Sequence, residues 1–179
     1  MKTINQYISE KLKITKKNTK NNIVIINTLE DLKKEIKTRI ISDNNEELDL
    51  SNISLSENIT SLDLLFANNM KIKKIDVTGW DVSSVKSMSE MFYTCTSLEE
   101  VIGLDTWDTS SCESFRRMFY DCNNLTMCDV ERWNIESLKD CGYMFKNCNK
   151  LSLDLTSWNL SKVKHIQMNR NSNISISEE

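Results

Sequence analysis

Residues 80–98 have the sequence WDVSSVKSMSEMFYTCTSL, and this stretch decides the fold because the chain repeats it. Residues 107–125 read WDTSSCESFRRMFYDCNNL, residues 133–151 read WNIESLKDCGYMFKNCNKL, and a shorter copy, WNLSKVKHIQMN, begins at residue 158. The four tryptophans that open these copies are separated by 27, 26 and 25 residues. A period of this length indicates a repeat architecture, in which each unit stacks on the next to bury a shared core.

A short apolar segment before each copy predicts a β-strand. Apolar and polar residues alternate there, as in LDL at 48–50 and IDV at 75–77, so one side of the strand faces inward. One inward column recurs once per repeat and includes a degenerate copy before Trp80, so we expect five coils that start near Glu47. The members of this column are Leu50, Val77, Leu104, Val130 and Leu155.

The second half of each copy predicts a short helix. Its apolar residues recur at i, i+3, i+6 and i+7, as in Val85, Met88, Met91 and Phe92. Serines that follow each tryptophan can cap such a helix. A unit of roughly 25 residues with one strand and one helix cannot bury both apolar faces alone. The expected fold is therefore an α/β solenoid of about five strand–helix coils.

The repeats occupy residues 48–168, and the flanking segments have distinct compositions. Residues 21–47 predict an N-terminal cap, a strand followed by a helix that begins at Asn27 or Thr28 and covers the open end of the array. Residues 169–179 form a polar C-terminal tail. The inward face of the cap helix is expected to contain Leu29, Leu32, Ile36 and Ile40.

Residues 1–20 form a basic amphipathic leader and linker. Its apolar residues fall on one face of a helix and are a candidate docking site for a partner, with a solvated basic terminus as the alternative. These candidate docking residues are Ile4, Tyr7, Ile8 and Leu12.

Charge and hydropathy exclude several classes of protein. Residues 1–40 contain ten Lys and Arg against four Asp and Glu, whereas residues 41–179 contain 13 against 22. No run approaches the roughly 20 apolar residues of a transmembrane helix, and the N-terminus lacks the apolar core of a signal peptide. We therefore expect neither a transmembrane segment nor export.

The six cysteines predict buried, reduced thiols rather than disulfides or a metal site. Cys95, Cys122 and Cys148 follow the repeat period and do not form the C-x-x-C spacing of metal ligands. The sequence contains few candidate catalytic residues: it has one histidine, His165, three glycines and no phosphate-loop or nucleophile motif. We expect no catalytic residues, no metal and no cofactor.

The string W-D-x-S-S-V-x-x-M-x-x-M-F-x-x-C-x-x-L at residues 80–98 resembles the repeat of the BspA-like leucine-rich surface proteins of bacteria. The resemblance covers three consecutive copies and implies a leucine-rich-repeat solenoid used for protein binding or adhesion. Departures include Cys141 in place of the first methionine and a last copy without its Met-Phe pair. The opening INQYISEKLKI is also similar to the openings of small proteins encoded by bacteriophages of gut bacteria.

A row of carboxylates is the candidate partner-binding site. The residue between the inward strand positions is Asp49, Asp76, Asp129 or Asp154, with Gly103 at the remaining position. Two interpretations stay open: local hydroxyls and water satisfy these groups, or they form an acidic strip for a basic protein partner. An acidic strip would repel phosphates, so we expect no nucleic-acid partner.

These patterns predict a non-enzymatic protein-binding module of a bacterium or bacteriophage, which could be part of the virion. The alternative is a bacterial cell-surface adhesin. Because no signal peptide is visible, we expect the protein in the cytoplasm of a bacterial host or within a phage particle.

Overall fold

Short strands dominate the computed structural model, which describes residues 23–43, 46–167 and 173–176. One α-helix, α2, spans Leu29–Asp43, and one short 3-10 helix, η1, spans Leu104–Thr106. The strands are β1 (Val24–Ile26), β2 (Glu47–Asp49), β3 (Ile53–Leu55), β4 (Lys74–Asp76), β5 (Glu100–Ile102), β6 (Met127–Cys128), β7 (Leu153–Leu155) and β8 (Ile174–Ile176).

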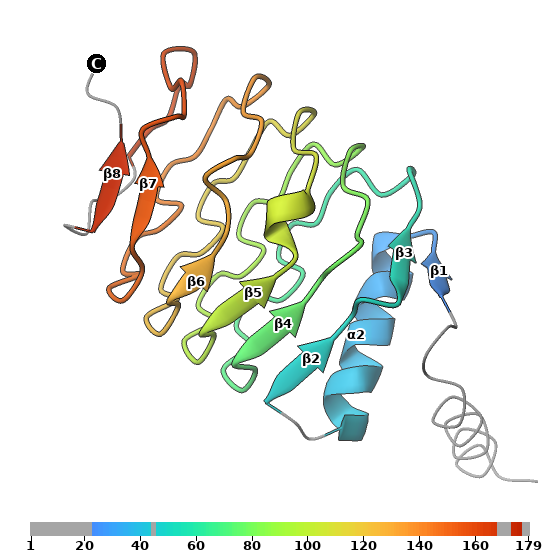
Figure 1. The fold of residues 1–179 in the computed structure, drawn as a ribbon. Coiled ribbons are helices and arrows are strands. Elements are labelled where there is room, and N and C mark those ends of the chain that lie inside the picture. The colour runs from blue at the N-terminus through green and yellow to red at the C-terminus, as the bar shows by residue number, and fades with distance from the viewer. Residues whose placement is uncertain (1–22, 44–45, 168–172, 177–179) are drawn as a thin grey trace, which may run out of the picture.

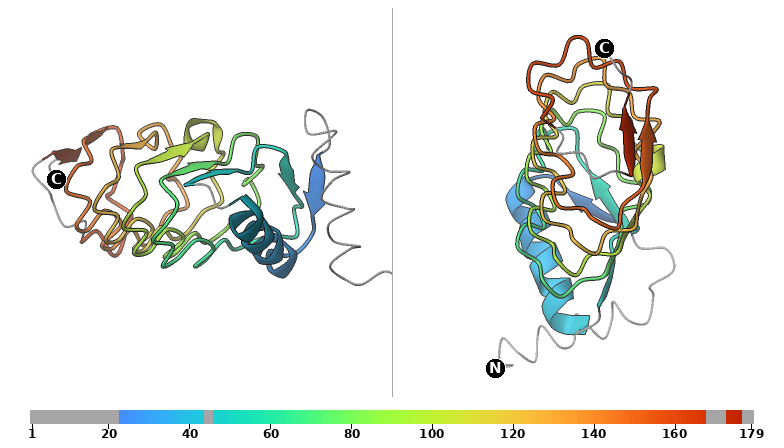
Figure 2. Two further views of the ribbon diagram at one scale, coloured as in Figure 1. Left: turned by 90° about the horizontal axis from the view of Figure 1, so that it is seen from below. Right: turned by 90° about the vertical axis from the view of Figure 1, so that its left-hand side faces the viewer.

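The strands pair in parallel, and neighbouring strands of the largest sheet come from successive repeats. The largest sheet has the order β2-β4-β5-β6, while β1 pairs with β3 and β7 pairs with β8. In the four-stranded sheet Leu48 aligns with Ile75, Ile75 with Val101 and Val101 with Cys128. Successive repeats thus lie side by side, each as one coil of chain (Figures 1 and 2).

The core lies inside the coils and is built from columns of identical or similar side chains. The predicted inward column, from Leu50 to Leu155, is confirmed because all five members are fully buried. Phe66, Phe92, Phe119 and Phe145 stack in sequence, with ring centroids 5.1, 5.0 and 5.6 Å apart. Such offset stacks add to the energy of apolar burial.

The tryptophans form a second buried column. Trp80, Trp107 and Trp133 stack with centroid separations of 6.4 and 6.0 Å. The indole N–H of Trp80 donates to the Leu50 carbonyl over 3.1 Å, and that of Trp133 donates to the Leu104 carbonyl over 2.8 Å. Trp80 and Trp133 therefore join neighbouring coils through both ring and polar group, whereas the buried indole N–H of Trp107 has no hydrogen-bond partner among the described residues and joins them through its ring.

The prediction of a helix in each repeat is wrong. Four turn segments, residues 62–69, 88–95, 115–122 and 141–148, replace the predicted helices. Each contains two non-glycine residues in the left-handed region, such as Glu90 (φ 58°) and Thr94 (φ 53°), and an α-helix does not continue through that conformation.

Backbone hydrogen bonds explain why turns replace helices. Within 88–95, Met88, Glu90, Phe92 and Thr94 donate their N–H groups to carbonyls of the next coil, at 2.7 to 3.0 Å. The N–H groups of Met91, Tyr93 and Cys95 close turns three residues back, as from Met91 to Met88. The apolar spacing is the one predicted, but the backbone bonds join coils rather than helical turns.

The helix predicted after Asn27 or Thr28 is present as α2. The hydroxyl of Thr28 accepts from the Asp31 N–H over 3.1 Å, which caps the first turn. Leu32 and Ile36 are buried, and Leu29 and Ile40 pack against the core. In Figure 1 the helix lies at the β1 end of the array, where it covers the first coil.

Two features of the strand line differ from expectation. Residues 101–105, VIGLD, contain one residue more than the other strand segments, a pattern typical of a β-bulge, but Gly103 adopts φ 94° and leads into η1. Its missing Cβ would lie 2.6 Å from the Thr78 Cα, so the neighbouring coil leaves no room for a side chain. Within the segment expected to be a polar tail, Ile174–Ile176 form β8, which extends the array beside β7.

Candidate functional site

The predicted acidic row lies on the outer side of the strands, but it is interrupted. Asp49 and Asp76 are direct neighbours on β2 and β4. The next position holds Ile102, which aligns with Asp76; the prediction that Gly103 holds it is wrong, because η1 takes up the extra residue. Asp129 directly follows β6, and Asp154 lies on β7, opposite Ser175.

Three of these carboxylates bind the turn that follows them. Asp49 Oδ1 accepts from the hydroxyl and N–H of Ser51 at 2.7 and 2.9 Å, and Asp154 Oδ1 accepts from the same groups of Thr156 at 2.6 and 3.0 Å. Asp76 accepts from the Thr78 N–H over 2.9 Å. The hydroxyl bonds are the main reason that the pKa values of Asp49 and Asp154 lie below the ordinary value. These two carboxylates are thus both oriented and charged at neutral pH.

Two exposed apolar side chains interrupt the acidic surface. Ile102 is 40% exposed and Met127 is 50% exposed, and they lie on the neighbouring strands β5 and β6. Single exposed apolar residues are ordinary, but two together beside carboxylates are typical of a contact patch. We call Asp49, Asp76, Ile102, Met127 and Asp129 the strand patch.

The turn segments carry a second group of functional interest, which the sequence did not single out. Tyr93 and Tyr120 stack at 5.1 Å, one residue after the buried phenylalanines. Arg117 lies 5.9 Å from the ring centroids of both Tyr120 and Tyr143, and Lys146 lies 5.5 and 5.4 Å from the same two. We call Arg117, Tyr120, Tyr143 and Lys146 the Tyr–Arg–Lys cluster.

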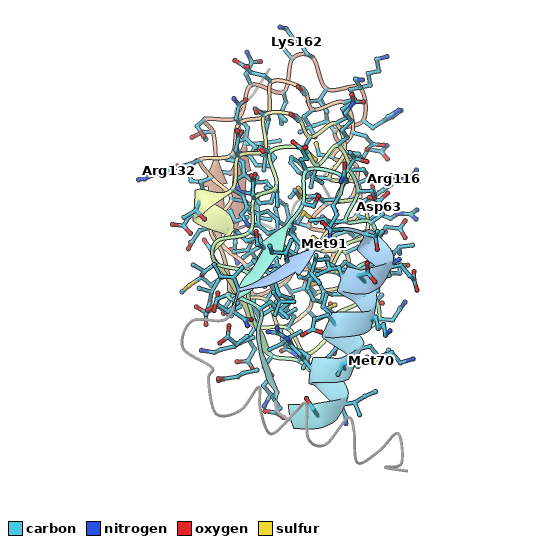
Figure 3. The ribbon with its side chains drawn as sticks, turned by 90° about the vertical axis from the view of Figure 1, so that its right-hand side faces the viewer. Asp63, Met70, Met91, Arg116, Arg132 and Lys162 are labelled. Atoms are coloured by element: carbon cyan, nitrogen blue, oxygen red, sulfur yellow. The ribbon has the colours of Figure 1, made fainter. Side chains whose placement is uncertain are left out.

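The two surfaces face away from each other. Arg116 precedes Arg117 of the cluster, and Arg132 follows β6 of the strand patch. Figure 3 shows these two arginines on opposite sides of the molecule, with Met91 between them. The Tyr–Arg–Lys cluster could have been found from the sequence only by asking which residues share a repeat position outside the apolar columns. At these positions Arg117 replaces Glu90 of the preceding copy, and Lys146 replaces Tyr120.

Hydrogen-bonded hydroxyls occupy the turn side of the earlier coils. Asp63 Oδ1 accepts from the Ser87 hydroxyl at 2.6 Å and from the Ser89 N–H at 2.7 Å. The Ser89 hydroxyl is 2.8 Å from that of Ser114 in the next coil. Because these groups satisfy one another, their arrangement favours a structural role.

Two hollows open on the described surface. One, of about 440 Å³, lies between α2 and the first turn segment and is lined by apolar residues and lysines, among them Ile40, Met70 and Lys71. The other, of about 340 Å³, adjoins the Tyr–Arg–Lys cluster and includes Arg116, Tyr143, Lys164 and His165. His165, the only histidine of the chain, is exposed.

Other kinds of site find little support in the described ranges. No group of three or more His, Cys, Asp or Glu side chains there is arranged to hold a metal ion. No helix among those residues has the length and hydropathy to cross a bilayer. The candidate docking residues of the leader, Ile4, Tyr7, Ile8 and Leu12, lie outside the described residues.

Comparison with known proteins gives one match. A family model described as "Mycoplasma protein of unknown function, DUF285" matches residues 60–178, about two thirds of the chain. No curated protein and no solved structure matches.

Proposed function

The chain belongs to the DUF285 family, a BspA-like, leucine-rich-type repeat family, and from this premise we propose that it is a non-enzymatic protein-binding module. In this proposal the stacked coils form a solenoid whose outer surface meets the partner. Columns of packed side chains fill the interior of the coils, which supports the proposal. The extended outer faces are then the regular surfaces on which a partner can bind.

The observation that carries the proposal is the exposure of Ile102 and Met127 within the strand patch. Specific interfaces place apolar anchors at their centre and polar groups at their rim. Here the rim contains the carboxylate of Asp76, aligned with Ile102, while Glu100, aligned with Met127, forms an ion pair with Lys74 at 2.9 Å. The partner is therefore a protein segment that combines apolar and basic residues.

The rigidity of the strand patch favours binding as well. Its strands are short, and the two in the middle, β4 and β5, are paired on both sides within the sheet, whereas β2 and β6 are the end strands of that sheet. Side chains at equivalent positions of adjacent strands repeat at about 4.8 Å, so the patch is a regular surface. A surface that is already ordered loses little conformational entropy on binding.

Site-specific photocrosslinking tests the proposal. A photoreactive residue replaces Ile102 in one variant and the exposed Lys34 of α2 in a control, and both are irradiated in cells that produce the protein. A protein crosslinked from position 102 but not from position 34 is then purified and its binding measured. Ile102→Asp is expected to weaken this binding by roughly tenfold or more, as for a central anchor.

Charge gives a second, independent readout on the same partner. Asp76→Asn combined with Asp129→Asn is expected to lower the association rate more than it raises the dissociation rate, because exposed charges steer encounter. Rising salt should weaken binding for the same reason. Affinity that ignores Ile102→Asp and both Asn substitutions would remove the strand patch from the proposed function.

A further inference from the structure

The turn side of the later coils is basic where the same side of the earlier coils is acidic or neutral. At one repeat position Asp63 and Ser89 are followed by Arg116 and then Gly142, and at another Ala67 and Tyr93 are followed by Tyr120 and then Lys146. The change in charge is therefore confined to one end of an otherwise regular face. This change in surface charge is not needed for the coils to stack, because the buried columns beneath the surface are apolar in every copy.

The acidic groups nearest the Tyr–Arg–Lys cluster already have partners. Glu90 Oε1 lies 3.4 Å from Arg117, Asp121 Oδ1 accepts from the Asn147 side chain at 2.5 Å, and Asp140 Oδ1 accepts from the Gly142 N–H at 2.8 Å. By contrast, Arg116, Lys146 and Lys164 have no carboxylate within 4.0 Å among the residues that the structure describes. The surface thus offers two exposed cations, Arg116 and Lys164, and a half-buried one, Lys146, that lies over the rings of Tyr120 and Tyr143.

The geometry of the Tyr–Arg–Lys cluster restricts what that ligand can be. Tyr120 is stacked against Tyr93, and both Arg117 and Lys146 lie near its ring. The ring is therefore occupied, and a nucleic-acid base would have to displace these neighbours in order to stack on it. Carboxylates can reach exposed cations without moving the ring.

A hollow beside the cluster adds the concave element that a docking surface needs. It measures about 340 Å³, and Tyr143 lines it together with the cations Arg116 and Lys164 and with Asp140, whose Oδ1 accepts from the Gly142 N–H. Tyr143 belongs to both features, so the hollow and the cluster form one continuous site. Ile166 supplies an apolar side chain to the same wall.

We propose that this basic, tyrosine-rich surface is a second docking site, which binds an acidic protein segment through Arg116, Lys146 and Lys164, with an apolar residue of that segment seated in the hollow. The two docking sites carry opposite charge on opposite sides of the coils. The protein would then bridge two partners, a basic one on the strand patch and an acidic one here.

Fluorescence anisotropy with two labelled probes tests the proposal on the full chain. The first probe is a short peptide rich in Glu, Asp and Leu, and the second is single-stranded oligothymidylate. The wild type is expected to bind the peptide more tightly than the oligonucleotide, with an affinity that falls as salt rises. Arg116→Gln combined with Lys146→Gln should weaken peptide binding roughly tenfold.

Matched variants distinguish the effect of lost charge from the effect of lost folding, and the second docking site from the strand patch. Lys34→Gln combined with Arg132→Gln removes the same charge from exposed positions elsewhere and should leave peptide binding within about twofold of wild type. Lys146→Arg keeps the cation and should retain binding. Ile102→Asp, which disrupts the strand patch, should also leave it unchanged, so failure of one site is distinguishable from failure of the other.

Three results would overturn the proposal. They are a wild type that does not bind the acidic peptide, a double Gln variant that binds it as well as the Lys34 and Arg132 control does, and tighter binding of oligothymidylate than of the peptide. Thermal melts of each variant accompany the titrations, and Lys146→Arg provides the comparison if the double variant is unstable.

Discussion

The Cys122 thiol donates a hydrogen bond to the carbonyl oxygen of Phe92, one coil earlier, over a distance of 3.1 Å. The same contact recurs from Cys95 to Phe66 at 3.1 Å and from Cys148 to Phe119 at 2.9 Å. Each thiol thus serves a backbone carbonyl of the preceding coil while filling apolar space. This double role explains why cysteine recurs with the repeat period.

Native thiols should be almost unreactive. All six cysteines are buried, and burial raises the pKa of Cys95, Cys112, Cys141 and Cys148 to about 12. At pH 8 the thiolate, which is the reactive form, is then a minute fraction in the folded protein. A colorimetric thiol assay should detect few groups in the native protein and six after unfolding. Intramolecular disulfides in non-reduced protein would contradict this prediction.

The same pKa shifts predict a loss of stability at alkaline pH. Each thiol has a folded pKa above its unfolded value of about 9, so its contribution is complete below pH 9 and is lost as pH rises toward 12. In that window the unfolded chain releases protons that the folded chain retains. The loss per thiol is at most about 1.4 kcal/mol per pH unit. Denaturant melts from pH 8 to 10.5 should show it, with a shallower slope for Cys122→Ala than for wild type.

The phase of the turn segments can be tested at two adjacent residues. Phe119 is fully buried between Phe92 and Phe145, whereas Tyr120 is half-buried on the outer side. Phe119→Ala should reduce the free energy of unfolding by about 3–5 kcal/mol, because it leaves a cavity in the core. Tyr120→Ala should cost far less. Equal losses in denaturant melts would mean that the assigned inward face is wrong.

Two glycines with similar backbone angles should respond differently to alanine. Gly103 has φ 94° and a site for Cβ only 2.6 Å from the Thr78 backbone, whereas Gly79 has φ 81° and nothing within 4 Å. Gly79→Ala should cost about 1–2 kcal/mol from the left-handed conformation alone. Gly103→Ala adds a backbone clash and should cost clearly more. Thermal melts that rank the two variants in the opposite order would contradict the close packing at η1.

The sequence predicted the carboxylates of the strand patch but not the position of Ile102 among them. The spacing of Asp49 and Asp76 placed both on one face of neighbouring strands, as the structure shows. The one-residue excess at Gly103 was visible too, but its effect on register was not, because a 3-10 turn and a bulge absorb an extra residue equally well. Only the pairing of β4 with β5 brings Ile102 into the row.

Periodicity by itself determined which residues lie inside this protein. Burial leaves a direct trace in a repeat, since each inward position must stay apolar in every copy, and the columns from Leu50 to Leu155 and from Phe66 to Phe145 follow it. Spacing of apolar residues does not determine which backbone groups bond to each other. That pairing depends on the neighbouring coil, whose carbonyls accept hydrogen bonds from the N–H groups of Glu90 and Phe92. The segment therefore forms successive turns instead of the expected helix.

Only the tertiary structure decided what the outer faces contain. Arg117 and Tyr143 are 26 residues apart in the chain, and nothing in either copy alone shows that the guanidinium of one lies 5.9 Å from the ring of the other. Stacking sets that distance, because adjacent coils bring equivalent and near-equivalent positions within reach of each other. The sequence therefore determined the core and the repeat, while contacts between coils determined the turns, the register at Ile102 and the Tyr–Arg–Lys cluster.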